Sequence, residues 1–509
     1  MPARVQRALY LAFYLFLLCC AMYAVPLDVV YGVQRSAIPY QLDYEEGNIL
    51  NAGLRIIHGL TPYPDPHAFP NALNPYGPLP YLAVALVVKL AGVSFLWPRL
   101  LVVASVFAIA FLIAFLVRAE AREMAMAAHG GTPTAPGDET TWWTWLVAAA
   151  FAALFPSMPL VQDWMPLLRV DLPGLALALG GLLTLKRLPQ RPWLAALLMT
   201  LAVFVKYTLI AAPLAALLWL LTRRDRRALV TFAATGAGVG LVLLGLTQLW
   251  SGGYFVFHML GTHADPFSFV VFRGKLLDFV IAHFWFMLLA AIYVVTAALW
   301  RSLPLPALYW LLCLGTVMTA GKRGSGGNHF LELVAASLIC AALGVVTLRT
   351  RVRWAPLAIA ATFAAVALLG PFVLTAGPYN DPANHVHGCG DLYTVVKNSP
   401  AQNILSENVG ALLLAGKPVF ISNPFIYRFL VTFRGWSDAP ILERVQQRQF
   451  DLLVLSGDLR DAKLRGSDRW SPQVIDAMGE NYRPVAKFNC LEGRVVMAPV
   501  GPPAGAAGQ

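Results

Sequence analysis

The chain has 509 residues, of which 58% are hydrophobic and only 13% are charged. Soluble domains are usually about 45–50% apolar and about 25% charged, so this composition excludes an ordinary water-soluble protein. The net charge of +11 is typical of membrane proteins, whose cytoplasmic loops carry excess Lys and Arg, and it indicates no nucleic acid partner.

Long apolar stretches recur from Arg7 to about Thr375 and then stop. A membrane-spanning helix needs about 20 mostly apolar residues, so we predict an α-helical polytopic membrane domain over residues 1–375. Residues 376–500 mix charge with short apolar runs, which predicts a small α/β extracytoplasmic domain, and residues 501–509 are expected to be disordered. The predicted spans, about eleven in number, are 8–31, 99–118, 142–160, 172–186, 192–205, 208–222, 228–249, 276–300, 305–320, 329–348 and 354–375.

The apolar run Pro78–Val93 decides the topology of everything after it. With the N-terminus in the cytoplasm, residues 32–98 form a first external loop that contains this run. Four later basic clusters then fall on one side together: outside if the run crosses the membrane, inside if it does not. These clusters are 118–122, 186–191, 222–227 and 349–353. Because cytoplasmic loops are the basic ones, we interpret 78–93 as a helix that lies in the membrane interface.

Three carboxylates follow the first predicted span in the sequence DYEEG: Asp43, Glu45 and Glu46. An amphipathic helix comes next and ends at Gly59. Transfer of a sugar with inversion needs a carboxylate to take the proton of the acceptor hydroxyl, and a helix at the membrane surface could present one. The alternative is that these acids solvate the loop and cap the helix.

A second acidic site is predicted in QDWMPLLRVDLPG, where Asp171 opens a helix close to Arg169 and Asp163. The topology places this segment on the same side of the membrane as Asp43. The alternative is that Asp171 serves as an ordinary helix N-cap.

Five basic residues break the positive-inside pattern, because the topology places them at external helix ends. They are Lys206, Arg273, Lys275, Lys322 and Arg323. A lipid phosphate is a natural partner for such cations, which would stabilise it as a leaving group. The alternative is that their side chains reach toward lipid headgroups. Nearby polar side chains suited to binding are Asn328 in GKRGSGGNHFLEL and His263 in FHMLGTHADPF.

The sequence contains no nucleotide-binding, nucleophile-elbow or CxxC motif, and no strong metal motif. A divalent metal ion held by Asp43, Glu46, His258 or His263 is an open alternative, and no cofactor is otherwise indicated. The cytoplasmic loops are too short for a soluble nucleotide-sugar domain, which favours a sugar donor carried by a lipid.

The C-terminal domain contains two of the six cysteines, Cys389 and Cys490. In an oxidising compartment these two residues could form a disulfide that closes the ends of the domain. The expected elements are strands at 403–406, 418–422, 450–455, 485–488 and 494–498, and helices at 409–415, 439–449 and 473–480.

The order of these features resembles the GT-C superfamily of membrane glycosyltransferases, in particular the bacterial protein O-mannosyltransferase and aminoarabinose transferase-like members. The resemblance covers residues 1 to about 350 and lies in four segments: DYEEG ahead of GLTPY, the interfacial YGPLPYL, RVDLPG, and VKYTLIAAPLAALLWLLTRRDRRA. It implies a GT-C-like fold in which Asp43 acts as base or orients the acceptor and Asp171 assists acceptor or metal binding. The sequence departs from the superfamily's Asp-Glu pair, because Tyr44 follows Asp43 and leaves the second role to Glu45 or Glu46.

We therefore expect an inverting glycosyltransferase that moves a sugar from a polyprenyl-phosphate donor to a glycan, lipid or protein acceptor. It would be a multi-pass protein of the bacterial plasma membrane that acts on the cell envelope at the outer face. Catalysis is assigned to Asp43, Glu46 and Asp171, and substrate binding to Glu45, Arg169, Lys206, His263, Arg273, Lys322, Arg323 and Asn328. A transporter or flippase of lipid-linked sugars and a non-catalytic membrane scaffold are the alternatives, although no internal repeat typical of transporters is visible.

Overall fold

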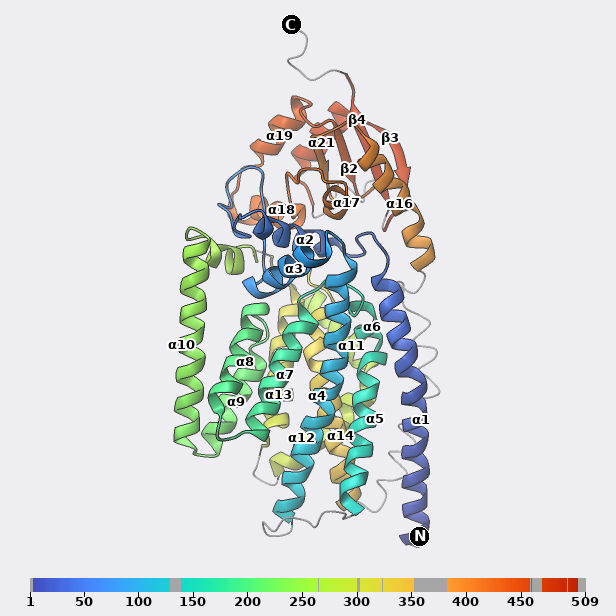
Figure 1. Cartoon of the computed structure of the whole chain (residues 1–509), viewed down its shortest axis with the longest axis vertical. Helices are drawn as coiled ribbons and strands as arrows, with labels where there is room; N and C mark the ends of the chain where they lie inside the picture. The colour runs from blue at the N-terminus through green and yellow to red at the C-terminus, as the bar shows by residue number, and fades with distance from the viewer. Residues whose placement is uncertain are drawn as a thin grey trace.

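The computed structural model describes residues 3–128, 139–263, 265–299, 303–322, 324–351, 382–457, 459, 469–491 and 493–501. Figure 1 shows two parts stacked along the long axis, a helical bundle and an α/β domain, with helices α2 and α3 between them. The predicted span 354–375 and residues 502–509 of the predicted tail lie outside the described residues.

The bundle consists of helices that are made mostly of apolar residues. Their bounds are α1 (Ala3–Ser36), α4 (Leu96–Ala128), α5 (Glu139–Ser157), α6 (Pro159–Trp164), α7 (Asp171–Arg187), α8 (Pro192–Val205), α9 (Ala211–Thr222), α10 (Arg226–Trp250), α11 (Phe269–Ala282), α12 (Phe284–Leu299), α13 (Leu305–Thr316) and α14 (Leu331–Arg351), with short turns η1 (Phe257–Gly261), η2 (Val317–Gly321) and η3 (Gly327–Phe330). Within the described ranges, 3 helices are long and apolar enough to cross a membrane, or up to 4 if one bent pair counts as a span. Length alone therefore does not establish the predicted total of about eleven spans.

Two of these long helices differ sharply in burial. The helix Gly327–Leu348, which joins η3 and α14, has 94% of its apolar window buried inside the protein, whereas α10 has only 6% buried. Along α10, Leu241 and Leu249 expose 69% and 81% of their surface. A helix that is apolar all round is stable only in an apolar environment, so α14 forms the core of the bundle and α10 requires lipid around it.

The predicted span 276–300 is not one straight helix. The chain breaks at His283, and α11 and α12 meet at an angle of 89°. His283 caps the end of α11, and its backbone N–H donates to the Phe279 carbonyl while its ring Nδ1 lies 3.0 Å from the same oxygen. The side chain thus competes for a carbonyl of the last helical turn, a local arrangement that apolar periodicity cannot predict.

The first external loop folds into two short helices, α2 (Tyr44–Ile57) and α3 (Pro78–Ala91), which pack against each other. A Cβ added at Gly53 of α2 would lie 2.6 Å from Val84 Cγ1 of α3, so the small residue permits this close approach. The 14 residues of α3 extend about 21 Å, which is less than the roughly 30 Å of a hydrocarbon core. The helix predicted at 78–93 is present, but the predicted spans α8 and α9 are as short or shorter, so its placement in the membrane interface stays a prediction.

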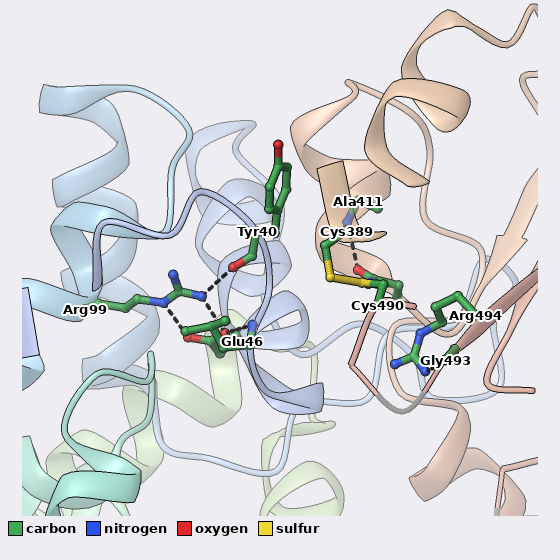
Figure 2. Close-up of a disulfide and its surroundings, with 10 residues drawn as sticks. Tyr40, Glu46, Arg99, Cys389, Ala411, Cys490, Gly493 and Arg494 are labelled. Atoms are coloured by element: carbon green, nitrogen blue, oxygen red, sulfur yellow. Dashed lines mark hydrogen bonds and ion pairs between the residues drawn. A yellow bond between two sulfur atoms is a disulfide. The ribbon is translucent and has the colours of Figure 1, made fainter. Parts of the chain in front are cut away.

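The C-terminal domain is a four-stranded sheet covered by helices. Its elements are α16 (Pro382–Asn398), β1 (Ile404–Ser406), α17 (Val409–Leu414), α18 (Pro424–Arg434), α19 (Ala439–Gln446), β2 (Leu452–Leu455), α21 (Pro472–Asn481), β3 (Tyr482–Phe488) and β4 (Arg494–Pro499). The strand order is β1-β2-β4-β3, with β1 and β2 parallel and the other pairs antiparallel. Cys389 and Cys490, whose pairing the sequence left open, form a disulfide that joins α16 to the segment between β3 and β4 (Figure 2).

The predicted strand 418–422 is wrong, because these residues pair with the first external loop instead of with the sheet. Ile421 forms an isolated parallel bridge with Asn71. The Asn71 N–H donates to Phe420 at 2.7 Å, and the Ser422 N–H donates back to Asn71 at 3.0 Å. Further along the contact, the Gly410 N–H donates to Gln41 Oε1 at 2.6 Å. The domain is therefore docked on the same end of the bundle as the first external loop.

Candidate active site

A cavity of about 940 Å³ lies where the bundle, the first external loop and the C-terminal domain meet. Its volume is at the upper end of the range for small-molecule sites. Charged side chains from all three parts line it: Arg35, Asp43, Glu45, Asp163, Arg169, Lys206, Asp265, Lys322, Arg469 and Arg494.

Asp43 combines a capping role with a place in the cavity wall. It is the N-cap of α2, where its carboxylate accepts the Glu45 N–H at 3.0 Å. The same carboxylate oxygen forms an ion pair with Arg169 Nη1 at 2.9 Å. Burial raises the pKa of Asp43 above its ordinary value, and the Arg169 guanidinium counteracts this effect. The capping interpretation and the functional interpretation of Asp43 are therefore compatible.

Glu46 lies behind this wall and does not line the cavity. Its carboxylate is fully buried and forms a bidentate pair with Arg99, at 2.7 Å from Nε and 2.7 Å from Nη2 (Figure 2). It also accepts the backbone N–H groups of Leu42 at 2.6 Å and Leu168 at 2.7 Å. Because both of its oxygens are occupied in holding the loop together, we do not carry the predicted catalytic role of Glu46 into the proposals below.

Asp171 is in the first turn of α7, but its side chain does not cap the helix, because the N-cap is Val170. The carboxylate instead pairs with Lys206 at the end of α8 and accepts Asn328 Nδ2 at 2.8 Å. All three side chains are buried. The N-cap alternative for Asp171 is therefore wrong, and three separate helix ends converge on this carboxylate.

Arg169 forms an ion pair with Asp43 and stands just before Asp171 in the chain. Burial opposes its charge, but Asp43, Tyr76, Asp171 and Glu45 together raise the pKa of its guanidinium. The plane of Arg169 also lies over the Trp164 ring, 4.7 Å from its centroid. Asp43 and Asp171 thus lie at the same end of the bundle, and the side of the membrane on which they lie stays a prediction.

The remaining predicted binding residues divide into two groups. Lys322 and His263 line the cavity, and Lys322 Nζ lies 3.5 Å from the His263 carbonyl. Burial and the neighbouring lysines lower the pKa of His263 to about 4, so its ring is neutral near pH 7. Arg273 is exposed on α11 and is not part of the lining, and Arg323 lies outside the described residues.

Lys275, the fifth of the cations that the topology predicts at external helix ends, holds the glycine-rich loop between η2 and η3. Its Nζ donates to Ala320 at 3.2 Å and to Ser325 Oγ at 2.8 Å, which fixes both ends of the loop. Within the loop, Gly324 has φ +73 and lies against the Phe425 ring, where a Cβ would be only 2.0 Å from Cζ. The loop is therefore shaped by α11 on one side and by the C-terminal domain on the other.

Sequence reasoning missed the part of the cavity wall that the C-terminal domain supplies: Phe425, Ile426, Arg469, Leu491 and Arg494. Arg469 pairs with the buried Glu407 at 2.9 Å, and its guanidinium lies over the Tyr44 ring, 5.2 Å from the centroid. No local pattern signals such contacts, since Arg469 lies 62 residues from Glu407 and much further from Tyr44 in the sequence.

The structure does not gather the metal ligands that the sequence left open. His258 is turned into the first external loop, where Nδ1 accepts the Asn74 N–H at 3.2 Å and Nε2 lies 2.9 Å from the Pro64 carbonyl oxygen. Across the described ranges, no group of three or more His, Cys, Asp or Glu side chains has the geometry to hold a metal ion.

Comparisons with known proteins identify the fold. The sequence matches no protein-family model and no curated protein. The structure is similar to the crystal structure of ArnT from Cupriavidus metallidurans in the apo state, with a TM-score of 0.61 and 14% identity over 95% of this chain and 100% of that chain. It is also similar to the same protein bound to undecaprenyl phosphate, with a TM-score of 0.59 and 13% identity over 94% of this chain and 98% of that chain. ArnT is an aminoarabinose transferase of the GT-C class, so the chain has the fold of a GT-C membrane glycosyltransferase.

Proposed function

We propose that the protein is an inverting glycosyltransferase that transfers a sugar from a polyprenyl-phosphate donor to a glycan, lipid or protein acceptor. The observation that carries this proposal is a large cavity lined by Asp43, Arg169, Lys206 and Lys322. Asp43 pairs with Arg169 in its wall, and the buried Asp171 beside it pairs with Lys206. This chemistry needs a base and cations that stabilise the leaving phosphate, and the site contains both. It also fits the fold, which is similar to that of a protein solved with bound undecaprenyl phosphate.

In the proposed reaction, the acceptor oxygen attacks the anomeric carbon from the face opposite the phosphate. The new carbon–oxygen bond forms as the bond to the phosphate oxygen breaks, and the bonding electron pair leaves with the phosphate. Asp43 takes the acceptor proton. Lys206 and Lys322 stabilise the charge on the departing phosphate, and Asp171 fixes Lys206 in place for that purpose.

The proposed topology places the N-terminus in the cytoplasm and the cavity with the C-terminal domain at the outer face of a bacterial plasma membrane. The ends of α7 support it. Asp171 begins the helix beside the cavity, where it pairs with Lys206 of the lining, and Lys186 and Arg187 stand in its last turn. The 17 residues of α7 separate these ends by about 26 Å. The basic last turn of α7 and the cavity therefore lie at opposite ends of this helix, which supports the proposed orientation.

The test is transfer by the purified protein in liposomes that contain one labelled polyprenyl-phosphate sugar at a time. Asp43→Asn should lower transfer by about 10²–10⁴-fold, because the amide cannot accept the proton. Folding should be retained, since Asn is as good an N-cap as Asp. The matched control is Asp278→Asn on α11, which changes an exposed carboxylate outside the cavity lining.

Full activity of Asp43→Asn would remove Asp43 from the mechanism. Movement of the labelled lipid between leaflets without any sugar transfer would instead favour the flippase alternative.

A further inference from the structure

Asn423 of the C-terminal domain contacts the acidic motif of the first external loop directly. Its Nδ2 donates to Glu45 Oε1 at 2.7 Å, and its Oδ1 accepts the Tyr44 hydroxyl at 3.0 Å. Asn423 is also the N-cap of α18, where the same Oδ1 accepts the Ile426 N–H at 3.0 Å. The side chain is fully buried, so its position is set by the fold and not by solvent.

Tyr44 also binds the first external loop to the C-terminal domain. Its hydroxyl accepts the Phe425 N–H at 2.9 Å while it donates to Asn423. Tyr44 and Glu45 at the start of α2 therefore form three hydrogen bonds with Asn423 and Phe425 at the start of α18. This contact holds together segments that are separated by about 380 residues, and it lies at the cavity wall.

Glu45 is the carboxylate that this contact controls. Its Oε1 accepts from Asn423 and its Oε2 accepts from Asn48 Nδ2 at 3.2 Å, while the residue lines the cavity beside Asp43. Glu46, by contrast, forms a fully buried ion pair with Arg99. Two amide donors from opposite sides orient Glu45 and favour its ionised form.

We propose that Asn423 is a positioning residue of the active site, which fixes the orientation and charge of Glu45, and that Glu45 is the second carboxylate presented to the substrate. This inference rests on the proposed glycosyltransferase function. It makes the C-terminal domain a part of the catalytic unit, because the motif beside the base is complete only when α18 is docked.

The charged and titratable groups that interact electrostatically with Glu45 come from its own helix, the first loop, α3 and the segment before α7. They are Asp43, Tyr44, Tyr76, Tyr81 and Arg169. Burial raises the pKa of Glu45, and Arg169, Asn48 and Asn423 counteract it. Loss of the Asn423 donor should therefore move the protonation of Glu45 toward neutral pH.

The test uses Asn423→Asp in the full-length protein. The aspartate keeps the N-cap of α18 and an acceptor for Tyr44, but it replaces the donor to Glu45 by a carboxylate. We expect kcat to fall about tenfold or more and the acid limb of its pH profile to move up by about one unit, with the KM for the donor lipid unchanged. The matched control is Asn408→Asp, the same substitution at the buried N-cap of α17, where Oδ1 accepts the Ala411 N–H at 3.1 Å.

Wild-type kinetics and an unshifted acid limb in Asn423→Asp would overturn the inference, as would an equal loss in Asn408→Asp. A stability cycle gives a readout that does not depend on transfer. Asn423→Asp should lower the thermal midpoint by roughly 2–4 °C, and adding Glu45→Gln should restore it, because the new amide donates to the new carboxylate.

If the effects of Asn423→Asp and Glu45→Gln on the thermal midpoint simply add, the inference is also overturned. If the wild-type protein transfers no sugar from any donor tested, the proposed function fails, and the stability cycle still decides whether Asn423 acts on Glu45.

Discussion

At the scale of single residues, the chemistry of the cavity depends on buried charges that need their partners. The pair of Asp171 and Lys206 is buried on both sides, with side-chain exposures of 5% and 7%. Removing one member of a buried pair leaves an uncompensated charge, whereas removing both can be nearly neutral.

We therefore predict that Lys206→Met destabilises the protein by about 3–5 kcal/mol and abolishes transfer. The double variant Asp171→Asn/Lys206→Met should recover most of the stability but none of the transfer. Thermal unfolding and the liposome assay measure the two effects separately. The control is Lys186→Met, which breaks a buried ion pair at the opposite end of α7 and should cost stability without a specific loss of transfer. Recovery of transfer in the double variant would contradict the assigned role of Lys206.

A second prediction at this scale concerns pH. Burial raises the pKa of Asp43, with Arg169 as the main counteracting group. A base must be ionised to accept a proton, so transfer should fall as the pH drops through this raised pKa. The acid limb of the pH–rate profile should lie above about 3.9, the value of an unperturbed aspartate. A limb at or below that value would show that Asp43 is not the group that titrates.

The two glutamates of DYEEG show how far local sequence can assign roles. Both are acidic and adjacent, and the resemblance to GT-C enzymes leaves either as the second carboxylate. The spacing of Asp43 and Glu46 is nevertheless that of a capping box, in which the later residue turns back to the N-cap backbone. That signal was available and points to a structural Glu46, whereas the pairing of Glu45 with Asn423 has no local signature.

At the scale of elements, the C-terminal sheet is tied to the cavity wall through Glu407. This buried carboxylate accepts Trp470 Nε1 at 2.6 Å and the Ser456 N–H at 2.8 Å, besides its pair with Arg469. Burial works against its charge, but Arg469, Ser456 and Arg494 hold the pKa of the Glu407 carboxyl below its ordinary value.

Because the pKa of Glu407 is lower in the folded domain than in the unfolded chain, its charged carboxylate stabilises the folded domain. That stability is fully present above the unfolded pKa of about 4.3 and is lost as the pH falls through the lower folded value. We predict that protection of the C-terminal domain from proteolysis decreases in this acidic window. Glu407→Gln should remove this pH dependence and cost about 1.5–3 kcal/mol at neutral pH. Glu443→Gln, which changes an exposed glutamate of α19, is the control and should change neither quantity.

The apolar helices were predictable because each carries its own signal in a continuous run of residues. The helix α3 was predictable from its own apolar run, whereas its placement in the membrane interface is a prediction from the charges of later loops. The break at His283 and the pairing of 418–422 with Asn71 were not, since both depend on partners that apolar periodicity does not reveal. The C-terminal helix α18, which reads locally as an apolar aromatic run, was missed for the same reason.

At the scale of the whole molecule, the disulfide encloses almost the entire C-terminal domain. Cys389 and Cys490 are 101 residues apart in sequence. A crosslink that closes a loop of this length restricts the unfolded chain and is worth up to about 4.7 kcal/mol in the chain-entropy description.

We predict that Cys389→Ser/Cys490→Ser lowers the unfolding midpoint of the domain and weakens the cavity wall, because Leu491 and Arg494 follow directly after the bond. The loss of transfer should grow with temperature as the domain opens. Cys313→Ser, which changes a buried free thiol in the bundle, is the control for thiol chemistry. Equal stability with and without the crosslink would show that docking on the first loop alone holds the domain.

The bridge between Asn71 and Ile421 has a consequence for how the protein is made. A ribosome releases Asp43 and its neighbours long before the residues that cover them. Every nascent chain therefore passes through a stage in which the acidic motif has been synthesised but the segment of the C-terminal domain that contacts it has not. Because Asn423 comes so late in the chain, an incomplete translation product carries the carboxylates of the acidic motif without the hydrogen bonds that orient Glu45.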